Sequence, residues 1–206
     1  MEKAAGKVCV GFSDPYVAKY NNNAGTVTYT EGRKLARGVS VKINPEVSDG
    51  NEFYADNVVA ESDGGNFVKG TVDLTVDGLH MEAERFIFGL AEPVEQTFGE
   101  VKVPVTKFGV KPNAPYVGIG YIAKYRSNGV ESYTPTVLCK GKFIDNGNEH
   151  QTSEQNPNYQ TQALKANLVH DDSADENWKL KLGDYNTRDE ALVALKAVLG
   201  VAEASA

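Results

Sequence analysis

The sequence predicts a mainly β protein: an antiparallel β-sandwich or barrel with one short mid-chain helix and a second helix near the C-terminus. Three observations support this class. Several segments alternate apolar and polar residues with the two-residue period of half-buried strands. Only two segments place apolar residues at helical spacing. The 206 residues, 41% hydrophobic and 24% charged, suit one core, so we expect a single domain over residues 1–206 with short flexible ends.

Alternation is clearest in residues 67–77, FVKGTVDLTVD, where the apolar residues share one face and the residues between them are polar. This is the pattern of a strand with one buried and one solvent-exposed face. Residues 38–44, GVSVKIN, repeat it. We expect shorter strands at residues 7–12 and 26–30, and a late hairpin in residues 167–182, where an acidic loop joins two strand-like segments.

The two helical segments carry different signals. In residues 79–90, LHMEAERFIFGL, apolar side chains recur at helical spacing and form one stripe that we expect to pack on a sheet. Residues 187–200, TRDEALVALKAVLG, open with a capping box, in which the side chains of Thr187 and Glu190 each accept a hydrogen bond from the other's backbone amide. Gly200 is a typical helix stop.

Residues 118–123, GIGYIA, match the G-x-G-x-x-A phosphate-binding pattern of dinucleotide-binding enzymes. That pattern works only where a strand ends in a tight glycine turn and a helix begins. Here the alternation continues to Ser127, and Asn128-Gly129 is then a strong two-residue hairpin signal. We therefore expect both glycines inside the first arm of a β-hairpin, at a bulge or beneath a close backbone approach.

Two long polar segments, residues 44–66 and 145–158, show weak periodicity. Loops of this length are uncommon in compact domains unless they bind something or remain disordered. Pro135 lies in the return arm of the central hairpin. It predicts an edge strand or a bulge there, because proline cannot donate a ladder hydrogen bond.

Charge and composition exclude several classes of function. A net charge of −7 disfavours a grip on nucleic-acid phosphates, which needs a basic surface. We find neither a signal peptide nor a membrane span, so we expect synthesis in the cytoplasm. Cys9 and Cys139 lie in apolar, strand-like contexts, and we expect both to be buried free thiols.

No pattern indicates catalysis. The sequence has no G-x-S-x-G elbow and no Cys/His motif, and none of its many carboxylates stands out. His80, His150 and His170 lack the spacing of metal ligands. The acidic loop at residues 171–176 has the charge for adventitious Ca²⁺ but lacks the EF-hand pattern. We therefore expect no catalytic residues, no cofactor and no metal.

The order and spacing of these segments resemble the major tail proteins of long-tailed bacteriophages (siphoviruses), specifically the phi13-type tail tube proteins. The matching stretches span roughly residues 5 to 200, and the longest is APYVGIGYIAKYRSNGVESYTPTVLCKGKF at 114–143. GVSVKINPEVSDGNEFYADN at 38–57 and GTVDLTVDGL at 70–79 also match, as do the late hairpin and the capped helix.

This resemblance implies a tail-tube-like fold and a structural, non-enzymatic virion protein. Such subunits close into homohexameric rings, and the stacked rings enclose a channel through which DNA passes during ejection without specific binding. The other implied partners are the tape measure, tail tip and terminator proteins, with no membrane. The implied location is the virion tail, with synthesis and assembly in the host cytoplasm.

Within this resemblance, we expect the segment at residues 44–66 to contact other subunits. Phe53 and Tyr54 would be its apolar anchors, and Asp56 and Asn57 would lie beside them. We also expect neighbouring subunits to pair edge strands and polar strand faces to line the channel. The acidic balance of the chain would keep DNA from adhering.

Two other classes of function stay open. The first is a carbohydrate- or cell-surface-binding β-sandwich of a tail tip, with Tyr16, Tyr20, Tyr54 and Trp178 as a sugar platform. The second is a hydrolase or nucleotide enzyme, which would depend on the glycine pattern or on stray carboxylates. The sequence favours the tube protein, because the aromatic residues do not cluster in one set of loops.

Overall fold

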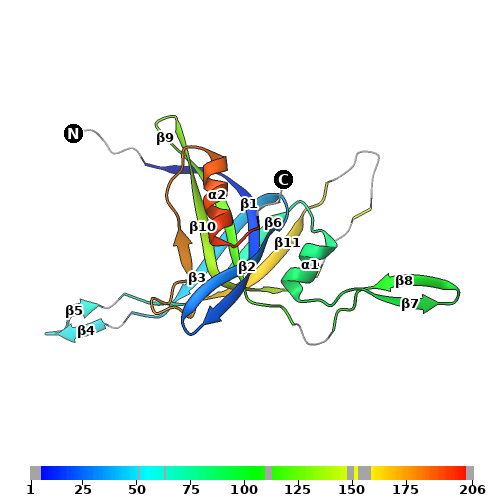
Figure 1. Ribbon diagram of the computed structural model, residues 1–206. Coiled ribbons are helices and arrows are strands. Elements are labelled where there is room, and N and C mark those ends of the chain that lie inside the picture. The colour runs from blue at the N-terminus through cyan, green and yellow to red at the C-terminus, as the bar shows by residue number, and fades with distance from the viewer. Residues whose placement is uncertain are drawn as a thin grey trace.

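The computed structural model describes residues 6–50, 52–62, 64–109, 113–147, 151–152 and 159–202. Over these residues the protein is mainly β, with antiparallel sheets and two helices, as the sequence predicts. Figure 1 shows a central body of long strands and two narrow hairpins that extend away from it on opposite sides.

The body is one eight-stranded sheet with strand order β2-β1-β9-β10-β11-β6-β3, and β12 pairs with β10 beside this path. Two register shifts interrupt the pairing of β1 with β9. They break the two-residue period, which is why the sequence predicts only the start of this long strand. The strands are β1 (Val8–Asn23), β2 (Thr26–Lys34), β3 (Gly38–Val47), β6 (Phe67–Val76), β9 (Val117–Ser127), β10 (Val130–Ile144), β11 (Gln162–Val169) and β12 (Lys179–Lys181).

The sheet curls around one hydrophobic core. The Phe12 ring of β1 packs so closely on β3 that a Cβ on Gly38 would lie 2.1 Å from a ring carbon. In β6 from Gly70 onward alternate residues are buried and the others are exposed or half-buried, which confirms the predicted solvent-exposed face of this strand, and β11 shows the same alternation. Val68, expected on the buried face, is instead 52% exposed. The helix α1 (Met81–Phe88) covers the core with Ala83 and Ile87.

A second core lies between the sheet and the helix α2 (Arg188–Val198). Strands β1, β9 and β10 are therefore covered on both faces, unlike β6, and their middle sections are nearly continuously buried. The predicted capping box is present: Thr187 Oγ1 accepts from the Glu190 amide at 3.3 Å, and Glu190 Oε2 accepts from the Thr187 amide at 3.2 Å. The buried residues of this core are Tyr16, Ala18, Ile122, Val137, Ala191, Leu195 and Leu199.

A buried carboxylate anchors the start of α2. Asp14 is 4% exposed and accepts hydrogen bonds from Arg188 Nη2 at 2.6 Å and from Lys34 Nζ at 3.2 Å. Burial by itself would raise the pKa of Asp14, but the hydrogen bonds from Arg188, Ser13 and Lys34 outweigh it and hold the pKa below its ordinary value. The charged Asp14 therefore ties β1, β2 and α2 together.

Strands β9 and β10 form the predicted central hairpin. Asn128 (φ 50°) and Gly129 (φ 80°) are its two-residue turn. The G-x-G-x-x-A pattern lies inside β9, and the strand continues where a phosphate site requires a helix. A Cβ on Gly118 would lie 2.5 Å from the Tyr29 ring, and a Cβ on Gly120 would lie 2.6 Å from Leu199 Cδ1. The glycines thus make room for packed side chains, and not for another backbone. The predicted bulge lies in the strands beside them, where β1 shifts register between Ser13 and Tyr16 and β10 between Leu138 and Gly141.

The predicted late hairpin is wrong, because β11 and β12 do not pair with each other. Both pair with β10 along one edge, β12 at residues 136–138 and β11 at residues 140–144. The 15-residue length of β10 allows this arrangement. Local alternation identifies two strands, but it does not identify their partner.

Pro135 lies at a local sheet edge beside a register shift, as predicted, because β12 ends before it and the next bridge joins Tyr133 to Tyr185. It pairs with Ile122 of β9, and its carbonyl accepts from the Leu182 amide at 2.9 Å. In an antiparallel strand the carbonyl oxygen and the nitrogen of one residue point to the same neighbour. The nitrogen of Pro135, which carries no hydrogen, is therefore on the side of β12, at a position just past the last β12 residue, Lys181. No bond to β12 is lost there.

The two cysteines differ from each other. Cys139 is a buried free thiol, as predicted, and burial raises its pKa to about 12. Cys9 is also free but is exposed, which corrects the prediction. The first three residues of β1 are all exposed, so an apolar strand pattern at this end of β1 does not imply burial.

Candidate interaction surfaces

The first candidate surface is the hairpin of β4 (Glu52–Ala55) and β5 (Val58–Ser62). It lies within the segment that the sequence predicted as one long loop. Asp56 (φ 53°) and Asn57 (φ 65°) form its two-residue turn, and both residue types tolerate the left-handed conformation that this turn demands. Figure 1 shows the hairpin projecting from the body.

All four predicted contact residues belong to this hairpin: Phe53 and Tyr54 in β4, Asp56 and Asn57 in the turn. The Tyr54 side chain is 60% exposed, and its hydroxyl donates to Glu52 Oε2 at 2.5 Å, a bond that raises the pKa of Tyr54. The Phe53 side chain lies outside the described part of the structure. A two-stranded hairpin alone is marginally stable in water, so contact with another surface would stabilise this one.

The second candidate surface is the hairpin of β7 (Val94–Phe98) and β8 (Val101–Val105), which the sequence analysis missed. Directly paired residues lie on the same face of a hairpin. One face therefore carries Gln96 and five apolar side chains, and the other face is mostly polar. A usable signal was the alternation in VEQTFGEVKVPV around Gly99, whose φ is 65°. The pairs on the apolar face are Val94 with Val105, Gln96 with Val103, and Phe98 with Val101.

This apolar face is in contact with solvent. Val94 is 57% exposed, Phe98 60% and Val101 62%. Single exposed apolar residues are ordinary, but several on one face of a projecting hairpin mark an interaction surface.

The third candidate surface is the polar face of β3, β6, β11 and β10. In three of its rows of paired residues there are four lysines and two acidic residues, and Lys69 forms a 3.4 Å ion pair with Glu46. This face therefore does not share the acidic balance of the whole chain. The rows are Glu46 and Lys69; Asn44, Thr71, Asn167 and Lys142; and Lys42, Asp73, Lys165 and Ile144.

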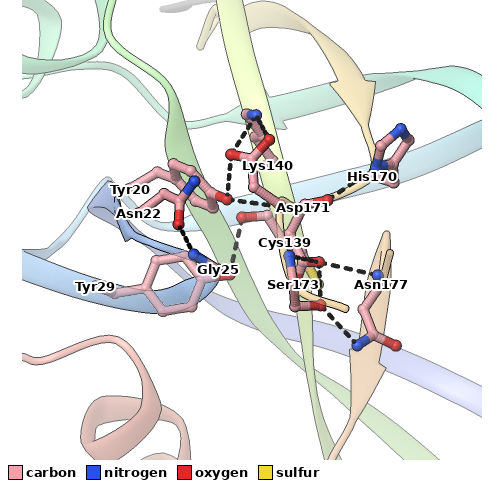
Figure 2. A network of polar contacts seen from close by, with 11 residues as sticks. Tyr20, Asn22, Gly25, Tyr29, Cys139, Lys140, His170, Asp171, Ser173 and Asn177 are labelled. Carbon is pink, nitrogen blue, oxygen red and sulfur yellow. Dashed lines mark hydrogen bonds and ion pairs between the residues drawn. The ribbon is translucent and has the colours of Figure 1, made fainter. Parts of the chain in front are cut away.

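A polar network closes the acidic loop between β11 and β12 (Figure 2). Asp171 is 4% exposed, and its Oδ1 accepts from Ser173 Oγ at 2.6 Å, from the Ser173 amide at 3.1 Å and from the Asn177 amide at 2.9 Å. The Asp171 carboxylate thus satisfies donors of its own loop. We interpret the acidic segment as a loop closure, and not as the adventitious Ca²⁺ site that its charge allowed.

Asp172 links this loop to the strands beside it. Its carboxylate pairs with Lys140 Nζ at 2.7 Å and accepts from the Tyr20 hydroxyl at 2.8 Å. The hydrogen bonds from Lys140 and Tyr20 lower the pKa of Asp172. Nearby, the Tyr29 hydroxyl donates to the Cys139 carbonyl oxygen at 2.8 Å (Figure 2), and burial raises the pKa of Tyr29. The polar groups of Asp172, Tyr20 and Tyr29 are thus all hydrogen-bonded within the protein, which is a structural role.

The histidines do not form a site in the described part of the chain. His80 precedes α1 and is exposed, and its side chain makes no capping bond. His170 Nδ1 lies 2.8 Å from the Asp171 carbonyl oxygen. His150 lies outside the described residues. Within those residues no three His, Cys, Asp or Glu side chains gather as metal ligands.

The proposed sugar platform is not assembled by the fold. Tyr16 is 7% exposed and belongs to the core under α2, and Tyr20 is bonded to Asp172. Trp178 is half-buried and stacks on Phe67, with ring centroids 4.7 Å apart. Among the four aromatic residues of that hypothesis, Tyr54 alone is mostly exposed, and it lies on the separate β4–β5 hairpin.

The fold and surfaces together define an antiparallel β-sandwich-like protein with two exposed hairpins. Comparisons with models of protein families and with curated proteins find no match for this chain. Neither described helix has the length and apolar character needed to cross a membrane.

Proposed function

We propose that this chain is a major tail tube protein, a structural subunit that polymerises as stacked hexameric rings around a channel for phage DNA. This proposal combines the resemblance to phi13-type tail proteins with one observation. Both projecting hairpins expose apolar side chains that their own chain does not cover, with Tyr54 at 60%, Val58 at 62% and Phe98 at 60% exposure. Self-assembly would cover these side chains and supply the packing that isolated hairpins lack.

The sheet edges support the same proposal. β2 and β3 end the strand order, so each has one edge without a strand partner among the described residues. Monomeric proteins must protect such edges, because they are templates for pairing with another chain. In the proposed ring, an edge of one subunit pairs with an edge of the next, and a head-to-tail contact of this kind closes when the rotation permits.

The polar face of β3, β6, β11 and β10 is the proposed wall of the channel. Asp73 lies directly between Lys42 and Lys165 in the sheet register, so neighbouring charges partly cancel. A wall with mixed charges holds phosphate weakly, because DNA affinity depends on the number of uncompensated cations. This surface is compatible with transit of DNA without specific binding. The reason is the mixture of charges on this face, and not the net negative charge of the whole chain.

The proposed partners and location follow from the role of a tail tube protein. Its further partners are the tape measure, tail tip and terminator proteins, and its location is the virion tail after assembly in the host cytoplasm. The proposal requires no enzyme activity and no cofactor. The sugar-binding alternative gains no support, because its aromatic residues are dispersed or buried.

The first test is negative-stain electron microscopy of the purified chain over a range of concentrations, combined with its mass in solution. We expect rings or tubes with six-fold end views. A chain that stays monomeric even with a tail-initiation complex would contradict the tube and direct attention to glycan binding.

A point variant tests the β4–β5 hairpin within this proposal. Tyr54→Asp should leave a folded subunit that fails to polymerise, because a charge replaces an exposed apolar anchor. Val193→Asp is the matched control, since Val193 of α2 is similarly exposed, at 67%, and lies outside the proposed contacts. Normal tubes from Tyr54→Asp would show that the assignment of this hairpin is wrong.

A further inference from the structure

The two projecting hairpins have free strand edges as well as exposed apolar side chains. Each hairpin is a two-stranded sheet of its own, so each of its strands has one outer edge without a strand partner among the described residues. Such an edge presents backbone N–H and C=O groups that another strand can pair with. Proteins protect the edges that must stay unpaired, so an edge without protection is a candidate for pairing with another chain.

The hydrogen-bond pattern of the β7–β8 hairpin follows from its turn. The turn has two residues, Gly99 and Glu100, so the flanking Phe98 and Val101 form a hydrogen-bonded pair. In an antiparallel ladder such pairs alternate with pairs whose backbone groups point away from each other, to the two outer edges. The pairs with outward-pointing groups are Thr97 with Lys102 and Glu95 with Pro104.

This pattern leaves the outer edge of β8 protected and that of β7 open. On β8, Pro104 has no N–H to offer at the edge, and the other outward-pointing residue is Lys102. Proline and lysine are typical of edges that stay unpaired. On β7, Glu95 and Thr97 both keep their N–H and C=O groups. An incoming strand can therefore pair with β7 but not fully with β8.

The β4–β5 hairpin has the same asymmetry. Its two-residue turn makes Ala55 and Val58 the hydrogen-bonded closing pair, so the backbone groups of Tyr54 point to the outer edge of β4. The register then shifts between Phe53 and Tyr54, which leaves Ala60 of β5 without a partner in β4. A bulge of this kind disrupts and protects an edge. Because the bulge lies in β5, the open edge of this hairpin is β4.

A second copy of this chain supplies the matching edge for each hairpin. Figure 1 shows the two hairpins on opposite sides of the body, so β4 and β7 do not meet within one molecule. Strands of four and five residues match in length, and their pairing would join two marginal hairpins into a more stable four-stranded sheet. Pairing of β4 with another β4 is disfavoured, because residues 52–62 carry three acidic residues and no Lys or Arg.

We propose that the β4 edge of one copy pairs with the β7 edge of a second copy, so that the two hairpins form one intermolecular four-stranded sheet. Backbone hydrogen bonds carry this contact, as in other cases of strand addition. The contact is heterologous: each paired copy keeps one open edge, so the contact can repeat from subunit to subunit. This inference rests on the proposed function, which requires repeating contacts, and it names one of them.

Proline substitutions test which edge of the β7–β8 hairpin pairs. Thr97→Pro removes the outward N–H of β7, and Lys102→Pro removes that of its direct partner in β8, so neither breaks a bond within the hairpin. Thr97→Pro should raise the concentration needed for assembly at least about tenfold, because the edge loses a hydrogen bond and the ring obstructs the incoming strand. Lys102→Pro is the matched control and should assemble as the wild type does. Equal effects of the two variants would overturn the inference, as would wild-type assembly by Thr97→Pro.

A mixing experiment identifies the partner of β7. Tyr54→Pro blocks the β4 edge, so this variant and Thr97→Pro each keep one open edge. Hydrogen exchange resolved to single residues should show, in the mixture, slowed exchange of the Tyr54 amide in the Thr97→Pro chain and of the Thr97 amide in the Tyr54→Pro chain. In each variant alone these amides should exchange as in the monomer. Slowed exchange at Thr97 in Tyr54→Pro alone would show pairing of β7 with itself and overturn the inference, as would a mixture without protection.

The outcomes separate this inference from the proposed function. Wild-type tubes in which the Tyr54 and Thr97 amides exchange as in the monomer would leave the tube protein standing and overturn this contact. Slowed exchange of both amides in open chains that never form tubes, even with a tail-initiation complex, would support the contact and contradict the tube. A chain that does not associate at its highest soluble concentration would overturn the contact.

Discussion

The packing of α2 on β9 yields a quantitative prediction about the glycine at position 120. Leu195 of α2 is fully buried, and a Cβ added to Gly120 would lie 2.8 Å from Leu195 Cδ1. Leu195→Ala should destabilise the protein by about 2–5 kcal/mol, because it removes a buried side chain and leaves a cavity. Gly120→Ala alone should cost about 1–3 kcal/mol by overpacking, less the few tenths to 1 kcal/mol that alanine gains over glycine.

The two changes should compensate each other. In the double variant the new methyl group of residue 120 occupies space that the Leu195 side chain vacates, and the Leu199 side chain, whose Cδ1 would lie 2.6 Å from that methyl group, gains room to move. The combined cost should then fall short of the sum of the single costs by about 1–2 kcal/mol, within the range for residues in contact.

Urea unfolding of the wild type, both single variants and the double variant measures this coupling. Val193→Ala is the control for the helix, because Val193 is 67% exposed, and we expect it to change stability by no more than about 0.5 kcal/mol. Single costs that add to within about 0.5 kcal/mol would refute the argument that Gly120 exists to admit the α2 leucines.

Two further predictions concern titratable groups. A thiol reagent should modify one cysteine in the native protein, the exposed Cys9, and should reach Cys139 only after unfolding, because Cys139 is buried and its pKa is raised to about 12; rapid modification of both thiols would contradict the described burial. The lowered pKa of Asp14 means that its stabilisation is fully present above its unfolded-state value of about 3.9 and is lost as the pH falls through the lower folded-state value. Arg188→Gln should therefore cost about 2 kcal/mol at pH 7, below the 3–5 kcal/mol for a fully buried pair because the Arg188 side chain is 46% exposed and Lys34 remains. Denaturation at both pH values should show a smaller cost near pH 2, and an equal cost would contradict the assignment.

The candidate surfaces were only partly predictable from the chain. The sequence placed the expected contact residues in the segment that forms the β4–β5 hairpin, but it predicted neither the hairpin nor its Asp56-Asn57 turn. The sequence analysis missed the β7–β8 hairpin, although apolar and polar residues alternate on both sides of Gly99. The alternation is short and neither face of this hairpin packs on the core, so the segment is difficult to distinguish from a loop by its sequence. Whether an apolar residue such as Phe98 is covered depends on which surface the rest of the fold brings near it.

The elements that could be predicted from the chain alone are those whose causes lie within a few residues. The alternation of β6, the capping box at Thr187 and the Asn128-Gly129 turn each act through neighbouring residues, and each was predicted from them. Which elements meet could not be predicted in this way. The shared edge of β10, the packing of Leu199 on Gly120 and the burial of Tyr16 all depend on segments far apart in the chain. The physical reason is that backbone conformation responds to local propensity, whereas strand pairing and burial are settled by the free energy of the whole packed core.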